Sequence, residues 1–297
     1  TDQVLPGASL RLLTSTGELI DEWVSTDEPH TVRGLEVGGA YIIEETMAPE
    51  GFVLETTGID FIVEDLREVQ SVLFKNEPTK VIISKQDLTT GEELPGAHLS
   101  LHDSSGNLIE EWISTDEPHL IEKLIIGNTY VLTENLAPLG YVTAESIEFT
   151  VQETGELQPV VMKDDITRIS ISKQDITTDK ELPGAHLSLR DNLGNLVEEW
   201  ISSDEPHLLE KLVVGETYTL TEDLAPLGFT LAQTIEFTVE DTGELQPIIM
   251  KDEPTTLLIR KVDPQGLPLA GAVFELTGVG AGPIRAREEG GIYLVQG

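Results

Sequence analysis

The segment Ile83–Asp87, ISKQD, recurs unchanged at Ile171–Asp175, and each copy ends an apolar run, VIISKQD in the first case and RISISKQD in the second. Successive side chains of a β-strand point to opposite faces, so Val81, Ile83 and Lys85 share one face. The second copy repeats the arrangement with Ile169, Ile171 and Lys173. An apolar face is expected to be buried, yet an unpaired lysine is almost never buried. Each copy therefore predicts a buried lysine with a polar partner elsewhere in the fold.

Two further segments of the same repeat place an acidic residue on an apolar face. In YVLTE, Glu134 shares a face with Leu132, and in VVMKD, Asp164 shares a face with Met162. The corresponding residues are Glu222 and Asp252 in the next repeat and Glu45 and Asn76 in the first. Three separate strands thus bring a lysine, a glutamate and an aspartate or asparagine to one core.

The segment LPGA and its variant LAGA mark the repeat, because they begin at Leu5, Leu94, Leu182 and Leu269, about 88 residues apart. Between them lie short alternating runs separated by Gly, Pro, Asn and Asp turns, without a helical apolar period. We therefore expect an all-β protein of tandem immunoglobulin-like β-sandwich domains. The predicted domains are residues 1–78, which lack the lysine strand, the complete units 79–165 and 166–253, and residues 254–297 as the start of a fourth unit.

Composition narrows the classes of partner. The 297 residues include 54 acidic and 18 basic side chains, for a formal charge of −36. Such a polyanion repels nucleic acid and anionic membranes, so we expect neither as a partner. No apolar run approaches the roughly 20 residues that span a bilayer. The sequence contains no cysteine, which excludes disulfides and cysteine-ligated zinc.

Burial of these side chains has chemical consequences. Desolvation disfavours the charged forms of amines and carboxyls alike, so a neutral amine beside a protonated acid is expected. A neutral Lys85 amine is a nucleophile that can attack the side-chain carbonyl of Asp164, while protonated Glu134 hydrogen-bonds the carbonyl oxygen and carries protons. The product is an amide bond and water, or ammonia where Asn76 is the acceptor. Contact within a fold supplies the effective molarity that free side chains lack.

The order of these motifs resembles a known family. A lysine near the start, then LPGA, YxLTE, APxGY and a last strand ending in Asn or Asp, is similar to the CnaB-type, SpaA-like prealbumin-fold domains of Gram-positive surface proteins and pilins. The resemblance implies an autocatalytic isopeptide bond between Lys and Asn or Asp, assisted by the glutamate. It implies two complete triads, with Glu45 and Asn76 matching part of another and Lys261 matching only the first member. Asn76 and Lys261 are expected to be unpaired in this chain.

Two alternatives to this chemistry stay open. Lys85 can form a buried ion pair with Glu134 and Asp164, or with Asp87, without any covalent bond, although burying such charges costs several kcal/mol each. The segment DEPH, present three times, offers Asp, Glu and His within four residues, but a turn explains it more simply than a metal site. We expect no metal and no cofactor. No G-x-S-x-G, H-E-x-x-H or Walker pattern occurs, so turnover of a substrate is not expected.

The function we expect is therefore structural: a segment of a secreted stalk or adhesin, anchored to the cell wall of a Gram-positive bacterium, whose domains lock themselves with Lys–Asp bonds. Self-cross-linking occurs once per domain, so the chain is not an enzyme. The alternative function is a module that binds a host matrix protein or glycan through the DEPH and APLGY loops. The partners would be host extracellular matrix or a neighbouring surface protein.

Overall fold

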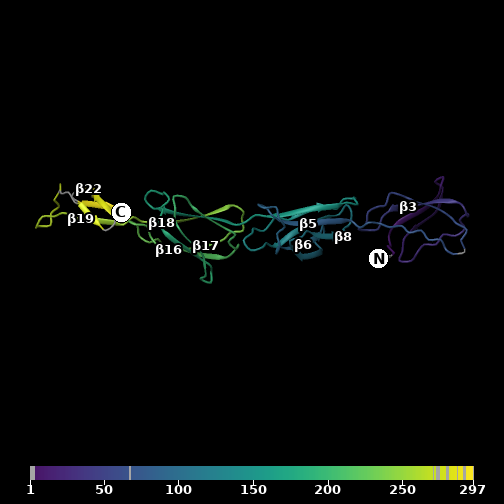
Figure 1. Cartoon of the computed structure of the whole chain (residues 1–297), viewed down its shortest axis with the longest axis horizontal. Coiled ribbons are helices and arrows are strands. Elements are labelled where there is room, and N and C mark those ends of the chain that lie inside the picture. The colour runs from purple at the N-terminus through teal and green to yellow at the C-terminus, as the bar shows by residue number, and fades with distance from the viewer. Residues whose placement is uncertain are drawn as a thin grey trace. The chain divides into compact units, whose positions relative to one another are not determined.

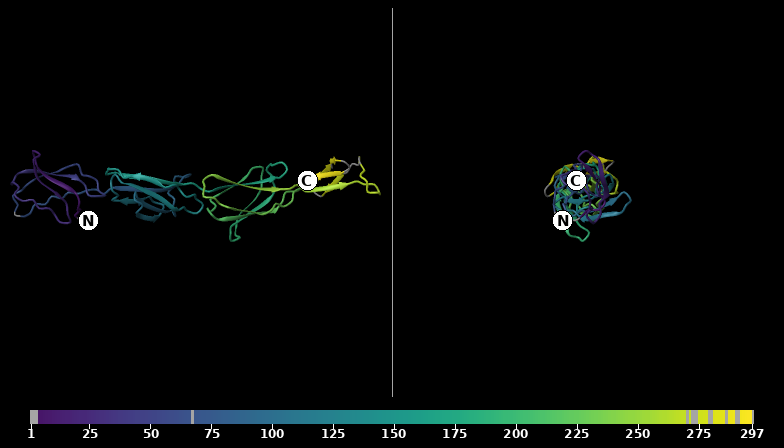
Figure 2. Two further views of the ribbon diagram at one scale, coloured as in Figure 1. Left: turned by 180° about the vertical axis from the view of Figure 1, so that it is seen from behind. Right: turned by 90° about the vertical axis from the view of Figure 1, so that its right-hand side faces the viewer.

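The described secondary structure is entirely β. The computed structural model describes residues 4–66, 68–269, 271, 275–278, 281–285, 287–289 and 292–296. Across these ranges the regular elements are strands and no helix occurs, as both views of Figure 2 illustrate. None of the described residues therefore belongs to a helix that could cross a membrane. The predicted all-β class of tandem β-sandwich domains is confirmed.

The second domain is a sandwich of two sheets. One sheet has the strand order β10-β9-β6-β7 and the other the order β11-β5-β8. Figure 1 labels β6 of the first of these sheets and β5 and β8 of the second. The bounds are β5 Lys80–Asp87, β6 His98–Asp103, β7 Leu108–Ile113, β8 His119–Glu122, β9 Thr129–Leu136, β10 Ile147–Thr150 and β11 Leu157–Asp164.

The first and last strands of this domain are neighbours. Strands β5 and β11 pair in parallel over their full length, with Lys85 opposite Met162 and Asp87 opposite Asp164. Because the side-chain period of a strand is two residues, Asp164 lies on the same face as Met162 and Lys85. The parallel register therefore places the acceptor, Asp164, two positions after Met162, the residue that lies opposite Lys85.

The third domain repeats this arrangement. Its sheets have the orders β14-β13-β16-β17 and β15-β12-β18, with Lys173 opposite Met250 in the parallel pair β12 and β18. The bounds are β12 Arg168–Asp175, β13 His186–Arg190, β14 Leu196–Ile201, β15 His207–Glu210, β16 Thr217–Leu224, β17 Ile235–Thr238 and β18 Leu245–Asp252.

Each complete sandwich encloses one apolar cluster. In the second domain the cluster combines the inward faces of both sheets, including Ile83, Leu99, Leu132 and Met162, all at most 2% exposed. The third domain uses the equivalent side chains Ile171, Leu187, Leu220 and Met250. Burial of such side chains stabilises a fold by about 1.5–3 kcal/mol each. The lysines thus stand at the end of a dry, well-packed face.

The first domain contains a single four-stranded sheet with the order β2-β1-β3-β4. Its strands are β1 Ser9–Thr14, β2 Leu19–Val24, β3 Ala40–Met47 and β4 Ile59–Ile62. The last strand that we expected here, ending at Asn76, is not formed, and this is a correction to the sequence analysis. A strand needs a neighbour for its backbone hydrogen bonds. Strands β11 and β18 have such neighbours in β5 and β12, the strands that carry Lys85 and Lys173, whereas no described residue provides one in the first domain.

Residues after the third domain form two small sheets, β19-β23-β22 and β20-β21. Their bounds are β19 Thr256–Arg260, β20 Glu275–Gly278, β21 Ala281–Arg285, β22 Arg287–Glu289 and β23 Ile292–Gln296.

Packing divides the whole chain into two compact units, one of Thr1–Pro138 with Thr143–Asp165 and the other of Leu139–Val142 with Ile166–Gly297.

The short loop Leu139–Val142 packs with the third domain because of a glycine. Gly140 has φ +84°, and a Cβ there would lie 2.7 Å from the carbonyl oxygen of Lys211. The Gly140 carbonyl accepts the Thr167 N–H at 3.1 Å, and the Lys211 ammonium donates to the Tyr141 hydroxyl at 2.8 Å. Only glycine allows this close approach of two backbones.

Candidate functional site

The second domain gathers Lys85, Glu134 and Asp164 in its interior. Lys85 comes from β5, Glu134 from β9 in the opposite sheet, and Asp164 from the end of β11. The Lys85 Nζ lies 3.0 Å from Glu134 Oε1 and donates to Asp164 Oδ1. The three side chains are at most 1% exposed. The structure thus brings together the three residues that the alternation pattern placed on core faces.

Burial changes the acid-base behaviour of the acceptor. Desolvation raises the pKa of Asp164 to about 7, the Lys85 ammonium opposes this shift, and the nearby Glu134 carboxyl adds to it. A carboxyl of this kind is a neutral acid for a large share of the molecules at neutral pH. The site therefore combines a buried amine with a carboxylic acid that water cannot reach.

The glutamate is held from one side only. Its Oε2 accepts the Ala144 N–H at 2.7 Å, which fixes the carboxyl plane. Its Oε1, which faces Lys85, and the Oδ2 of Asp164 accept no hydrogen bond among the described residues. Buried carboxyl oxygens without donors are rare. An acid proton on one of these groups would satisfy them, and such a proton is what general acid catalysis requires.

The third domain repeats the site closely. Lys173 Nζ lies 3.1 Å from Glu222 Oε1 and donates to Asp252 Oδ1, with all three side chains buried. The Ala232 N–H donates to Glu222 Oε2 at 2.7 Å. Burial raises the pKa of Asp252 to about 6, again against the opposing effect of the lysine. Two independent copies of one constellation therefore exist in the chain.

The first domain holds only two members of the constellation. The Asn76 amide donates to Glu45 Oε2 at 2.6 Å and to the Val53 carbonyl at 3.0 Å. Glu45 is 7% exposed, and its Oε1 accepts no hydrogen bond among the described residues. The acid and the acceptor are thus in contact, and the position of the lysine is not filled by a described residue.

Lys261 differs from the other two lysines. It lies directly after β19, and its side chain is exposed. Its carbonyl accepts the Leu269 N–H at 2.8 Å, as the carbonyls of Lys85 and Lys173 accept from Leu94 and Leu182. The backbone pattern of the repeat is therefore kept without burial of the amine.

The DEPH histidines pack against tryptophans. His119 stacks on Trp112 with ring centroids 4.5 Å apart, and its Nε2 lies 2.9 Å from Glu110 Oε1. The other two domains repeat the contact with Trp23 and His30 and with Trp200 and His207. Within the described part of the chain no cluster of three His, Asp or Glu side chains suits a metal ion. In the second and third domains each stacked pair joins a strand of one sheet, β7 or β14, to a strand of the other, β8 or β15.

One recurring carboxylate at the site was not predicted from the sequence. Glu93 immediately precedes LPGA, and its oxygens accept from the Ser84 hydroxyl and the Lys85 N–H; Glu181 does the same in the third domain. The signal was present, because a glutamate precedes LPGA in both complete repeats.

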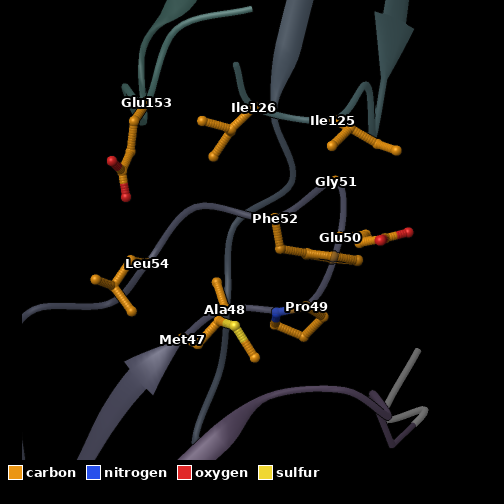
Figure 3. A pocket seen from close by; sticks show the side chains of 10 residues that line it. All are labelled: Met47, Ala48, Pro49, Glu50, Gly51, Phe52, Leu54, Ile125, Ile126 and Glu153. Atoms are coloured by element: carbon orange, nitrogen blue, oxygen red, sulfur yellow. The ribbon is translucent and has the colours of Figure 1, made fainter. Parts of the chain in front are cut away.

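An open depression of about 240 Å³ lies where the APEGF loop of the first domain faces the second. Phe52 stands between the Met47–Pro49 segment and the isoleucines Ile125 and Ile126 (Figure 3). Its walls are largely apolar, with Glu50 and Glu153 at the rim. None of the predicted triad residues lines it.

Known proteins match most of the chain, and the family match extends over residues 1–254. A family model described as the SpaA prealbumin-like fold domain matches residues 1–78, 79–166 and 167–254. No curated protein sequence matches this chain.

Three solved structures illustrate the similarity. The TIE protein of Bacillus anthracis is 25% identical over 84% of this chain and 48% of that chain, with a TM-score of 0.44. The shaft pilin SpaA of Lactobacillus rhamnosus GG is 13% identical over 60% of this chain and 98% of its own, with a TM-score of 0.29. A streptococcal ancillary pilin is 19% identical over 78% of each chain, with a TM-score of 0.32.

The family match covers each of the three repeats that the LPGA motif delimits, and together these repeats make up most of the chain. The chain therefore belongs to the SpaA family of prealbumin-like fold domains.

Proposed function

We propose that this chain is a structural segment of a bacterial surface stalk or adhesin, and that its second and third domains lock themselves with isopeptide bonds between Lys85 and Asp164 and between Lys173 and Asp252. The observation that carries the proposal is the contact of each buried Nζ with an aspartate Oδ1 and a glutamate Oε1 at almost no exposure. Reacting groups held in contact have effective molarities of about 10⁵ M or more.

The reaction follows from the geometry. Burial keeps part of Asp164 as the neutral acid, with a pKa of about 7. The Lys85 Nζ attacks the Asp164 Cγ, and the acid form of Glu134 donates to the carbonyl oxygen as negative charge develops there. Glu134 then transfers a proton from the nitrogen to the departing hydroxyl, so an N–C bond forms, a C–O bond breaks and one water leaves.

A permanent bond suits a load-bearing segment. Lys85 and Asp164 are 79 positions apart, at the start and end of the second domain, and they lie on adjacent parallel strands. Tension that enters through β5 can leave through β11 without unfolding the sheets between them. In the chain-entropy model, closing a loop of this size stabilises a domain by roughly 4–5 kcal/mol. The chemistry needs no oxidant, and each domain reacts only once.

The ion-pair alternative predicts a different mass. If both bonds form, the intact chain weighs two waters less than its sequence, whereas a buried ion pair leaves the mass unchanged. Intact-mass spectrometry of the folded wild-type chain distinguishes the two. The unmodified mass on well-folded protein would reject the cross-link and leave the ion pair as the account of the site.

The proposed location is the outer surface of a Gram-positive bacterium, with the parent protein anchored to the cell wall. Membership of the SpaA family supports this location. Protease shaving of intact bacterial cells, with an antibody against the second domain, tests it. Protection of the epitope until the cells are lysed would contradict a surface location.

The second candidate function is adhesion, and the depression beside Phe52 favours it. Its apolar walls and acidic rim suit an apolar side chain next to a basic one, as a host matrix protein can present. The test measures binding of the full chain to immobilised matrix proteins. Phe52→Ala is expected to weaken binding while Phe229→Ala, in the equivalent loop of the third domain, does not. Equal binding by wild type and both variants would remove this depression as the contact site.

A further inference from the structure

The outer edge of β5 has no paired strand at the position of Lys85. Strand β8 pairs with β5 only from Lys80 to Ile83, so the backbone beyond Ile83 has no strand on that side. The short segment Glu92–Leu94 occupies the edge instead, and the Leu94 N–H donates to the Lys85 carbonyl at 2.6 Å.

A single carboxylate completes this edge. Glu93 Oε2 accepts the Lys85 N–H at 3.2 Å, while Oε1 accepts from the Ser84 hydroxyl and, at 3.4 Å, from the Gln86 amide. Three consecutive residues centred on the lysine thus donate to one side chain. Hydrogen bonds to a charged acceptor are stronger than those between neutral groups.

The third domain has the same contacts. Glu181 Oε2 accepts the Lys173 N–H at 3.2 Å, and Oε1 accepts from the Ser172 hydroxyl at 2.7 Å and the Gln174 amide at 3.2 Å. The Leu182 N–H donates to the Lys173 carbonyl at 2.7 Å. Both complete domains therefore build the same contact set.

The other repeats supply a comparison within the chain. Val4 and Pro268 take the place of Glu93 before the first and fourth copies of the motif. In the fourth repeat the Leu269 N–H still donates to the Lys261 carbonyl, yet the lysine is exposed. The backbone bond alone is thus compatible with an outward amine, whereas the carboxylate accompanies both buried amines.

We propose that Glu93 and Glu181 are positioning residues that hold the lysine strand in register for cross-linking. The carboxylate fixes the backbone of Lys85 from the outer edge of the strand, while the lysine side chain extends from the face of the sheet into the core. Small displacements of a reacting group slow such reactions strongly, by roughly 100-fold for 1 Å. This inference rests on the proposed isopeptide chemistry, and it concerns the rate of that reaction.

A carboxylate is required because all three partners are donors. A glutamine at position 93 offers one acceptor oxygen, and its NH₂ group would face a backbone N–H or the Gln86 amide. We therefore expect Glu93→Gln to retain part of the effect and Glu93→Ala to lose it.

The test follows the reaction in the full chain. Chain collected unfolded in urea, and shown by its mass at time zero to carry no cross-link, is refolded by dilution and quenched at intervals in acid. Digestion and mass spectrometry then count the Lys85–Asp164 and Lys173–Asp252 linkages separately. The intact third domain serves as an internal control in every Glu93 variant.

The expected result for Glu93→Ala is a Lys85–Asp164 rate roughly ten- to a hundredfold lower, with the Lys173–Asp252 rate unchanged. Tyr130→Phe, which removes the hydroxyl that accepts the Ile125 N–H in the same domain, is the control for general destabilisation. It should leave both rates within twofold of the wild type. If Glu93→Ala does not fold, as judged by hydrogen exchange in β6 and β9, the same comparison is made with Glu93→Gln.

The outcomes separate this inference from the proposed function. A Lys85–Asp164 rate within twofold of wild type in the folded Glu93 variant, or an equal slowing by Tyr130→Phe, overturns the positioning role while the cross-link stands. Failure of the wild-type chain to form either linkage overturns both.

Discussion

Lys85 and Lys173 are the two largest of the side chains that the fold buries almost completely. Each is tolerated because two carboxyl groups contact its amine, so loss of either carboxyl should be costly. Removing one partner of a buried charged group typically destabilises a protein by about 3–5 kcal/mol. The second carboxyl, that of Glu134 or Glu222, can act as a counter-charge alone or can also carry the proton.

Glu134→Ala distinguishes these roles. We expect this variant to be one water lighter than its own sequence, where the wild type is two waters lighter, because the group that polarises the Asp164 carbonyl is gone. It should also melt earlier in the second domain. The lost cross-link alone corresponds to roughly 4–5 kcal/mol. Glu222→Ala is the matched control and should change only the third domain, with additive effects in the double variant. A Glu134→Ala chain that is two waters lighter than its own sequence would contradict catalysis by Glu134.

The raised pKa of Asp164 predicts a pH dependence of stability in the domain that is not cross-linked. Its folded pKa of about 7 lies above its ordinary value of 3.8, mainly because of burial. The folded state therefore holds a proton that the unfolded state has released between these values, and stability falls as pH rises from 4 to 7. Glu134→Gln should show this fall, by a few kcal/mol at most, in urea titrations at each pH.

The control for this prediction is the double variant Glu134→Gln with Asp164→Ala, which has no carboxyl to titrate at the site. Subtracting its pH profile removes the contribution of the many surface carboxylates. If the two profiles run parallel between pH 4 and 7, Asp164 has an ordinary pKa in the folded domain and holds no extra proton there.

At the scale of elements, the stacked histidine and tryptophan connect the two sheets of a domain. Trp112 lies on β7 of one sheet and His119 on β8 of the other. His119→Ala removes the ring contact and the bond to Glu110, which together correspond to about 1–3 kcal/mol. We expect faster hydrogen exchange in β8. His102→Ala, a residue of β6 outside the stack, should leave that exchange unchanged, and equal effects of both variants would refute the role of the stack.

Much of the fold and of the site follows from local pattern. Alternation alone placed Lys85, Glu134 and Asp164 on core faces, because a period of two residues assigns each side chain to one face. The repeated LPGA segment revealed the tandem organisation before any strand was located. These features depend on residues near one another in sequence.

Features that depend on contacts between residues far apart in the sequence were not predicted. The strand expected to end at Asn76 satisfies the alternation, with Val72 and Phe74 half-buried, but a ladder needs a neighbour, and no described residue provides it. The contact of Glu93 with Lys85 depends on where β8 stops, and the stacking of His119 on Trp112 depends on the crossing between sheets. Neither property is encoded in a local period.

For the whole molecule, the account predicts a distinctive response to force. In the wild-type chain the residues between Lys85 and Asp164, and between Lys173 and Asp252, should not extend when the two ends are pulled. Glu134→Ala should add one extension step of roughly 260 Å, the reach of the 79 positions released. Single-molecule force spectroscopy measures this step. The first domain has no cross-link and should give a step of comparable length in both chains. One further step of that length in the wild type would show that the second or third domain is not locked.

The most direct test of the central claim is the identification of the bond itself. Wild-type chain is digested with trypsin and with a protease that cleaves after glutamate, and the peptides are sequenced by tandem mass spectrometry. We predict branched peptides in which the β5 segment is joined through Lys85 to Asp164, and the β12 segment through Lys173 to Asp252, each one water lighter than its two parts, with no tryptic cleavage after either lysine. Linear peptides that end at Lys85 and Lys173, together with unmodified peptides that contain Asp164 and Asp252, would contradict the claim.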